Sequence, residues 1–180
     1  MNKQLLALLG IGGLLLLTLK KQAEGKPYKR TCSQLDLNII ATSWGVRGDY
    51  LWAIFGVETS FGENVVNNPG DGRGPMQILP STKDLLIKRY PQLAGMDEET
   101  CYGAFNFASA HMKYTAAVRG WDNSDLRNVV AYNEGPNGSN TFKGEWLYRN
   151  AMNTTIIDCG VHYFNKFRDI YLAAFGEFKG

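Results

Sequence analysis

Apolar residues in most of the chain recur at the spacing of one helix face. From residue 32 onward they stand three or four positions apart, and the alternation typical of a half-buried strand is rarely sustained. Stretches rich in glycine, asparagine and proline separate these segments. We therefore expect a mainly α-helical domain, long enough to bury a hydrophobic core. The helices are expected at residues 33–43, 49–60, 81–90, 98–119, 124–132, 143–154 and 162–175. The expected N-caps are Asp49, Ser81 and Ser124, and the expected stops are Gly62 and Gly120.

The chain opens on a different pattern. Residues 4–19 carry no charge and are rich in leucine, and Lys20 and Lys21 follow directly. A helix of this length spans about 24 Å, less than the ~30 Å hydrocarbon core of a bilayer. We favour an uncleaved membrane anchor over a signal peptide, because two lysines precede the small residues of the one candidate cleavage site, and over a buried helix. The chain then divides into a hydrophobic segment (1–20), a basic linker (21–31) and a helical domain (32–180).

The formal net charge of +2 comes from the N-terminal tail. Six of the 19 lysines and arginines lie in the first thirty residues beside a single acid, and the rest of the chain holds 13 basic and 16 acidic residues. A surface that follows nucleic-acid phosphates needs an excess of basic groups. We therefore expect no nucleic-acid partner for the domain.

The cysteines and histidines form no metal-binding pattern. Cys32, Cys101 and Cys159 lie far apart in the sequence, as do His111 and His162. No metal ion or organic cofactor is expected. One disulfide with a leftover thiol and three buried thiols are both compatible with these positions, and the sequence does not give the pairing.

Glu58 interrupts an otherwise apolar helix face. Leu51, Ile54, Phe55 and Glu58 are related as i, i+3, i+4 and i+7. Burial raises the pKa of a carboxyl group, and an acid that titrates near neutrality suits general acid catalysis. A structural glutamate bonded to backbone amides or to an arginine is the alternative. The loop that follows, residues 62–80, is long and rich in glycine and asparagine, as functional loops often are.

Three segments in order resemble motifs of the soluble, lysozyme-like lytic transglycosylases. Residues 53–62, around Glu58, resemble the glutamate-serine motif of that family. Residues 74–78 (Gly-Pro-Met-Gln-Ile) resemble its glycine-leucine-methionine-glutamine motif, and residues 131–135 (Ala-Tyr-Asn-Glu-Gly) its alanine-tyrosine-asparagine-x-glycine motif. The resemblance covers about residues 35–155. It implies a lysozyme-like α-helical domain with the long loop at its cleft, preceded here by an N-terminal hydrophobic helix.

The chain departs from the family pattern at three positions. Thr59 replaces the serine that follows the glutamate, which keeps the hydroxyl but restricts its rotamer. Pro75 replaces the leucine and removes a backbone donor. Glu134 stands where a small residue is usual and adds a carboxylate near the cleft.

The resemblance implies cleavage of the β-1,4 bond between N-acetylmuramic acid and N-acetylglucosamine in peptidoglycan, without water. Glu58 would protonate the glycosidic oxygen, and the substrate's own N-acetyl group would relieve the developing positive charge. Glu58 would then accept the proton of the muramoyl 6-hydroxyl as the 1,6-anhydro ring closes.

Narrower roles follow from the same resemblance. Thr59 would orient Glu58 or the N-acetyl group, and Gln77 would make a polar contact to substrate. Met76 would form a cleft wall, although ordinary core packing is an equally good interpretation. The further expected substrate-binding residues are Tyr132 and Asn133, at the scissile bond, and Tyr148, near Glu58 or the N-acetyl carbonyl.

Two other functions remain open. A lysozyme-type muramidase of the same fold would need a second carboxylate, for which Glu63 and Asp71 are the acids in the adjacent loop. A non-catalytic glycan-binding assembly component would have no need of Glu58. The expected partners are peptidoglycan strands, a membrane through the N-terminal helix, and a secretion, conjugation or virion assembly. The expected location is a membrane with the domain facing peptidoglycan, in the bacterial periplasm or in a bacteriophage virion.

Overall fold

The computed structural model describes residues 28–67, 72–138 and 159–177. Helices dominate these ranges, whose only β-type pairings are isolated bridges, so the mainly α-helical fold is confirmed. The hydrophobic segment, most of the linker and the expected helix at 143–154 lie outside them. No helix within them has the length and apolar character to cross a membrane. The helices are α2 (Gln34–Trp44), α3 (Gly48–Thr59), α4 (Pro80–Arg89), the 3-10 helix η1 (Pro91–Leu93), α5 (Cys101–Arg119), α6 (Arg127–Gly138) and α8 (Cys159–Phe175).

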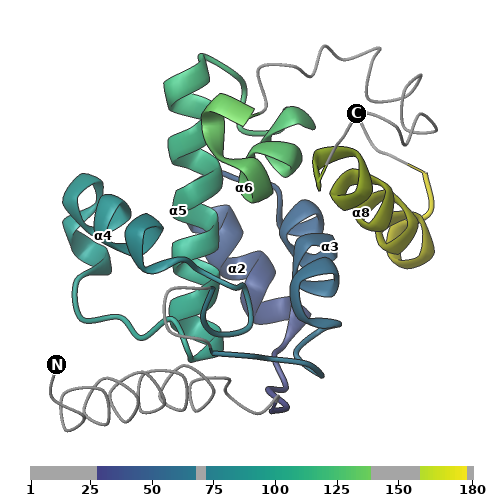
Figure 1. Ribbon diagram of the computed structural model, residues 1–180, viewed down its shortest axis with the longest axis horizontal. Helices are drawn as coiled ribbons and strands as arrows, with labels where there is room; N and C mark the ends of the chain where they lie inside the picture. Colours follow the sequence, from purple (N-terminus) through teal and green to yellow (C-terminus); the bar gives the residue numbers. More distant parts are fainter. Residues whose placement is uncertain (1–27, 68–71, 139–158, 178–180) are drawn as a thin grey trace, which may run out of the picture.

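Helix α5 is the centre of the bundle (Figure 1). Helix α4 lies on one side of it, and α3 and α8 lie on the other. Helices α2 and α6 pack against α5, and α8 packs against both α3 and α6. Residues 103–112 of α5 are all buried, as expected for a helix surrounded by others. The largest fully buried side chains are Leu37, Leu51, Ile54, Phe55, Met76, Leu86, Leu93, Phe105, Phe107, Phe164, Phe167 and Tyr171.

Helix α3 begins one residue earlier than expected, so Asp49 is not its N-cap. The cap position belongs to Arg47, whose side chain makes no capping hydrogen bond. Asp49 lies in the first turn, where its carboxylate pairs with Arg47 and accepts a hydrogen bond of 2.8 Å from the Tyr171 hydroxyl. This arrangement joins the start of α3 to α8.

The other two expected N-caps are also wrong. Helix α4 begins at Pro80, whose fixed φ suits a first helical position, so Ser81 lies inside the first turn. Helix α6 begins after Ser124, whose hydroxyl binds the carboxylate of Asp122 at 2.6 Å. Helix α6 also continues to Gly138, beyond the expected end at residue 132.

Two glycines shape helix ends. Gly120 is confirmed as the stop of α5, in the left-handed conformation with φ of 65°. Helix α3 ends at Thr59 with Ser60 as its C-cap, so Gly62 acts in the turn that follows. A Cβ at Gly62 would lie 1.9 Å from the carbonyl oxygen of Arg30, so only glycine fits there.

A disulfide joins Cys32 to Cys101, with a Cα–Cα distance of 5.6 Å. It ties the segment before α2 to the first residue of α5 across 69 positions of sequence. Of the two interpretations left open by the sequence, the structure supports the disulfide for this pair.

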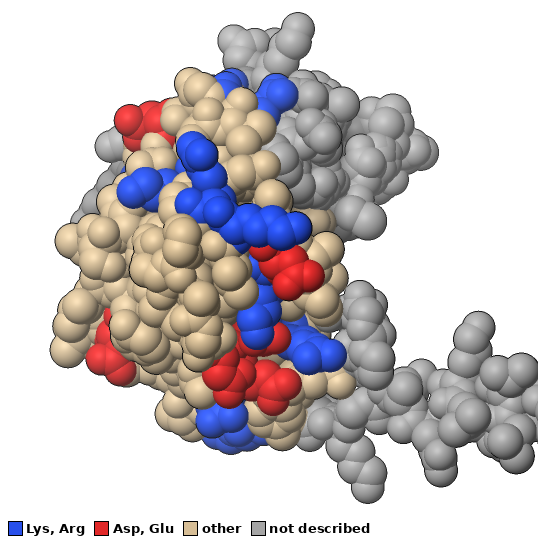
Figure 2. Space-filling view, turned by 90° about the vertical axis from the view of Figure 1, so that its left-hand side faces the viewer, with Lys and Arg blue, Asp and Glu red and all other residues tan. Residues whose placement is uncertain are grey.

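Basic and acidic side chains are mixed on the face shown in Figure 2. Acidic side chains (red) lie between the basic ones (blue), and a broad area beside them has no charged side chain. Several basic residues are held in ion pairs, among them Lys83 with Glu98 and Arg127 with Asp125.

Candidate active site

Glu58 lies at the end of α3, where its helix face leaves the core. The preceding residues of that face, Leu51, Ile54 and Phe55, are fully buried, whereas Glu58 is partly exposed to a cavity. Loss of solvent raises the pKa of its carboxyl from 4.5 to about 7. Nearly equal amounts of acid and carboxylate are therefore present near neutral pH, which suits a group that gives and takes a proton.

Tyr163 on α8 holds the carboxyl of Glu58. Its hydroxyl donates a hydrogen bond of 2.6 Å to Oε1 of Glu58. This bond and the positive charge of Lys166, also on α8, lower the pKa of Glu58 and partly oppose the effect of burial. Sequence reasoning missed Tyr163, because it belongs to the same apolar face of α8 as Phe167 and Tyr171 and resembles a core residue.

The loop after α3 folds back on itself beside Glu58. Arg73 and Ile78 exchange two backbone hydrogen bonds, of 3.0 and 2.9 Å, across a tight turn. Within it Gly74 has φ of 68°, and a Cβ there would lie 1.8 Å from the carbonyl oxygen of Glu98. The turn is therefore pressed against the segment that leads into α5.

Gln77 combines a strained backbone with a fixed side chain. Its φ of 48° is in the left-handed region, which costs a non-glycine residue roughly 1–2 kcal/mol. Its amide nitrogen donates to the carbonyl oxygens of Val66 at 3.0 Å and Gly74 at 2.9 Å. The amide nitrogen is thus occupied by the loop, and the side chain lines the cavity with its carbonyl oxygen available for a polar contact.

The hydroxyl of Thr59 connects the end of α3 to this loop. It donates to the carbonyl oxygen of Pro75 at 2.9 Å and accepts from the backbone amide of Gly62 at 3.1 Å. Thr59 is 2% exposed and does not line the cavity beside Glu58. Its contacts support the loop, whereas the sequence predicted that it orients Glu58 or the substrate.

Tyr132 and Met76 form a second connection between the loop and the helices. The Tyr132 hydroxyl donates a hydrogen bond of 2.8 Å to the carbonyl oxygen of Met76. The Met76 side chain is fully buried in the core and does not line the cavity, which agrees with the core-packing interpretation. The Tyr132 ring and Asn133 do line it, both from α6.

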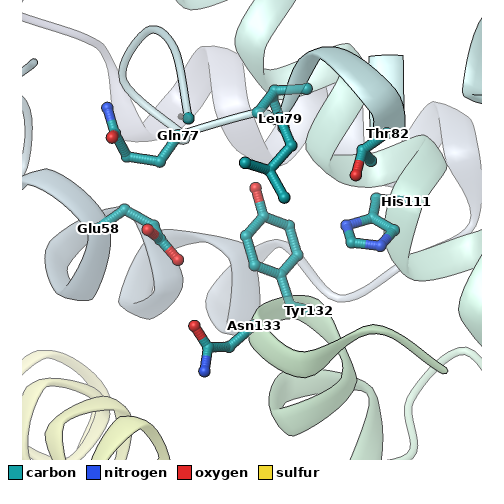
Figure 3. Close-up of a pocket in the computed structure, with 9 residues that line it drawn as sticks. Glu58, Gln77, Leu79, Thr82, His111, Tyr132 and Asn133 are labelled. Atoms are coloured by element: carbon teal, nitrogen blue, oxygen red, sulfur yellow. The ribbon is translucent and has the colours of Figure 1, made fainter. Parts of the chain in front are cut away.

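One cavity of about 220 Å³ lies beside Glu58, and we call it the Glu58 cavity. Figure 3 shows Glu58 on one side of the Tyr132 ring and His111 on the other, with Leu79 and Thr82 above. Burial lowers the pKa of His111 to about 4, so its imidazole is neutral at physiological pH. The lining residues are Glu58, Gly72, Gln77, Ile78, Leu79, Thr82, His111, Tyr132 and Asn133.

The cavity does not include every residue that the sequence singled out. Glu63 is exposed and pairs with Lys29 at 2.5 Å, outside the lining. Asp71 and Tyr148 lie outside the described residues, as does the side chain of Glu134. Within the described ranges, no group of three His, Cys, Asp or Glu residues is placed to hold a metal ion.

Comparison with known proteins identifies the family. The model of the transglycosylase SLT domain matches residues 37–147, more than half of the chain, and this range includes Glu58, Gln77 and Tyr132. No curated protein matches the chain, and no solved structure does. Proteins with this domain carry a lytic-transglycosylase-type activity that degrades peptidoglycan. The chain therefore belongs to the transglycosylase SLT domain family, within the lysozyme-like superfamily.

Proposed function

We propose that this protein cleaves the β-1,4 bond between N-acetylmuramic acid and N-acetylglucosamine and leaves 1,6-anhydro-muramoyl ends. The observation that carries the proposal is the environment of Glu58. It is the one carboxylate among the described residues that line the cavity, and its pKa is raised to about 7. One group can then serve as the acid and, after giving up its proton, as the base.

In the first step the Glu58 carboxyl gives its proton to the glycosidic oxygen as the bond from that oxygen to C1 of the muramoyl sugar breaks. The positive charge at C1 is shared with the carbonyl oxygen of the substrate's own N-acetyl group. The Tyr163 hydroxyl, 2.6 Å from Oε1, stabilises the Glu58 carboxylate that this step leaves.

In the second step the 6-hydroxyl oxygen of the same sugar bonds to C1 and passes its proton to Glu58. The acid is restored, and no water is consumed. A hydrolase that inverts the anomeric centre needs a second carboxylate roughly 6.5–9.5 Å from the acid to activate water. The placement of Glu63 in a surface ion pair, outside the cavity lining, supports the transglycosylase over this alternative.

The remaining lining residues are suited to hold a sugar. Tyr132 offers the face of its ring, with its hydroxyl fixed on Met76. Asn133 is exposed at the cavity, and the carbonyl oxygen of Gln77 is available to a sugar hydroxyl or amide. These three residues would position the sugar at the scissile bond.

Digestion of purified peptidoglycan followed by mass spectrometry tests the proposal. An anhydro end is one water lighter than a reducing end, so the two products differ in mass. We expect mainly anhydro muropeptides. Mainly reducing ends would instead support a muramidase of the same fold.

We also propose that the domain acts locally while residues 4–19 hold it at a membrane. The run of uncharged residues in this segment and the basic linker after it support an anchor. Such an arrangement suits an envelope apparatus for secretion or conjugation, and it suits equally a virion that opens the wall during entry. Fractionation of cells that produce the chain, with N-terminal sequencing of the mature protein, tests whether the segment is retained.

A further inference from the structure

His111 is a lining residue of the Glu58 cavity that the proposed reaction does not use. It lies in the middle of α5 and is 9% exposed. Its ring contacts that of Tyr132, with 5.1 Å between centroids. Among the described residues, neither of its ring nitrogens has a hydrogen-bond partner. Since the imidazole lines the cavity, these nitrogens can bond a ligand group there.

The imidazole presents an uncharged pair of hydrogen-bonding atoms. Because burial lowers its pKa to about 4, His111 is neutral at physiological pH. A neutral imidazole has one N–H donor and one nitrogen acceptor. It therefore suits a ligand group that both accepts and donates, and it offers no positive charge to a carboxylate.

The neighbours of His111 in the cavity have the same character. Thr82, from α4, lies beside it and adds a hydroxyl that can donate and accept (Figure 3). Leu79 and Ile78 add apolar surface. No lysine or arginine is among the described residues of the lining, so this end of the cavity has no cation for the carboxylates of a peptide stem.

We propose that His111 and Thr82 form a subsite that binds the acetamido group of the N-acetylglucosamine unit, on the other side of the cleaved bond from the muramoyl sugar. This inference rests on the proposed function, since it places that unit across the Tyr132 ring from Glu58. The acetamido carbonyl would accept from His111, and its N–H would donate to the Thr82 hydroxyl. Its methyl group would lie on Leu79.

The subsite distinguishes acetylated from de-N-acetylated glycan. A glucosamine unit has an ammonium group in place of the acetamido group. It has no acceptor for the His111 N–H and no methyl group for Leu79, and it places a charge beside the buried His111 ring.

Titration of the full chain in detergent with a chitotetraose tests the subsite directly. The Glu58→Gln background keeps the sugar intact, and histidine labelled with 15N gives imidazole signals for the two histidines of the chain. We expect the His111 signals to shift with the N-acetylated oligomer and not with its de-N-acetylated form. Equal shifts with both oligomers, or none with either, would overturn the proposal.

Variants separate a binding role from a structural one. His111→Leu keeps a similar volume and is expected to weaken binding of the acetylated oligomer about tenfold, whereas His111→Gln restores part of the affinity. Thr82→Val, at a partly exposed position, is expected to weaken the same binding and provides the test if His111→Leu does not fold. Binding by both Leu and Val variants at the level of the parent would contradict the subsite.

The subsite and the reaction can fail independently. On peptidoglycan, His111→Leu in the otherwise unchanged chain is expected to raise KM about tenfold with a smaller effect on kcat. Anhydro products with an unchanged KM would overturn the subsite and leave the reaction standing. Reducing ends, together with a raised KM, would overturn the reaction and leave the subsite standing.

Discussion

The hydroxyl of Tyr163 lies 2.6 Å from Oε1 of Glu58 and donates a hydrogen bond to it, although the two residues are 105 positions apart in the chain. Helix α8 thus reaches the end of α3 and sets the position of the one carboxylate among the described cavity residues. The bond favours the charged form of Glu58, while burial favours the neutral form. The balance keeps the pKa at about 7, close to the pH at which the group would work.

Replacing Tyr163 by phenylalanine removes this bond and keeps the ring. Because the bond lowers the pKa of Glu58, its loss raises that pKa, and the fall in lytic activity at alkaline pH moves to higher pH. The maximal rate is expected to drop about tenfold, because the carboxylate left by the first step loses its donor. A pH profile of peptidoglycan lysis measures both effects.

Tyr171→Phe is the matched control for that experiment. Tyr171 lies on the same helix, and its hydroxyl donates to Asp49 at 2.8 Å rather than to Glu58. Its loss is expected to lower stability and to leave the pH profile in place. A profile of Tyr163→Phe that coincides with that of the parent would contradict the role given to Tyr163.

The raised pKa of Glu58 also predicts a pH-dependent difference in stability. The folded protein keeps its proton up to about pH 7, whereas the unfolded chain releases it near 4.5, so the charge destabilises the fold as pH rises through this window. Glu58→Gln has no such charge. Its advantage in free energy of unfolding is expected to grow from near zero at pH 4 to about 3 kcal/mol at pH 8. Urea denaturation of both proteins at several pH values measures it, and a constant difference would contradict the raised pKa.

Thr59→Val is expected to destabilise the protein by about 1–3 kcal/mol. The substitution leaves the Pro75 carbonyl and the Gly62 amide without their partner in a buried place. Thr59→Ser keeps the hydroxyl and is expected to retain most of the stability. Urea denaturation compares the three proteins. A loss of lysis in Thr59→Ser without a loss of stability would instead support the direct role at Glu58 that the sequence suggested.

Removing the disulfide is expected to lower stability by about 2–4 kcal/mol, because the bridge closes a loop of 69 positions in the unfolded chain. The double variant Cys32→Ala, Cys101→Ala tests this in thermal denaturation. Dithiothreitol should lower the Tm of the parent to that of the double variant and leave the double variant unchanged. An equal effect of the reductant on both would contradict the pairing.

The sequence was sufficient for the parts of the structure that depend on local pattern. The face of Leu51, Ile54 and Phe55 placed Glu58 at the margin of the core, and the expected helices that the structure describes lie close to their expected positions except at the end of α6. The three N-cap predictions failed for different reasons: Pro80 begins α4 ahead of Ser81, and Ser124 bonds to the nearby Asp122 before α6 begins. Asp49 is committed to Arg47 and Tyr171 instead of to the helix start.

The residues of the candidate site could be predicted from the sequence only where they belong to one of the family motifs. Gln77, Tyr132 and Asn133 do line the cavity with Glu58. Tyr163 was not predictable, since it lies on an aromatic face of α8 that resembles core and its contact depends on how α8 packs on α3. The wide separation of the histidines and cysteines in the sequence argued against a metal site at His111. Its place in the cavity lining can be seen only in the folded structure.

Lysis of peptidoglycan by Glu58→Gln, beside Glu63→Gln as the matched control, shows whether Glu58 is the catalytic acid. Glutamine cannot donate the proton, so Glu58→Gln is expected to lose lysis by at least about a thousandfold while glycan binding is nearly unchanged. Glu63 lies in an exposed ion pair with Lys29, so its variant is expected to lyse at the parent rate. Undiminished lysis by Glu58→Gln would place the catalytic acid elsewhere and contradict the proposed reaction.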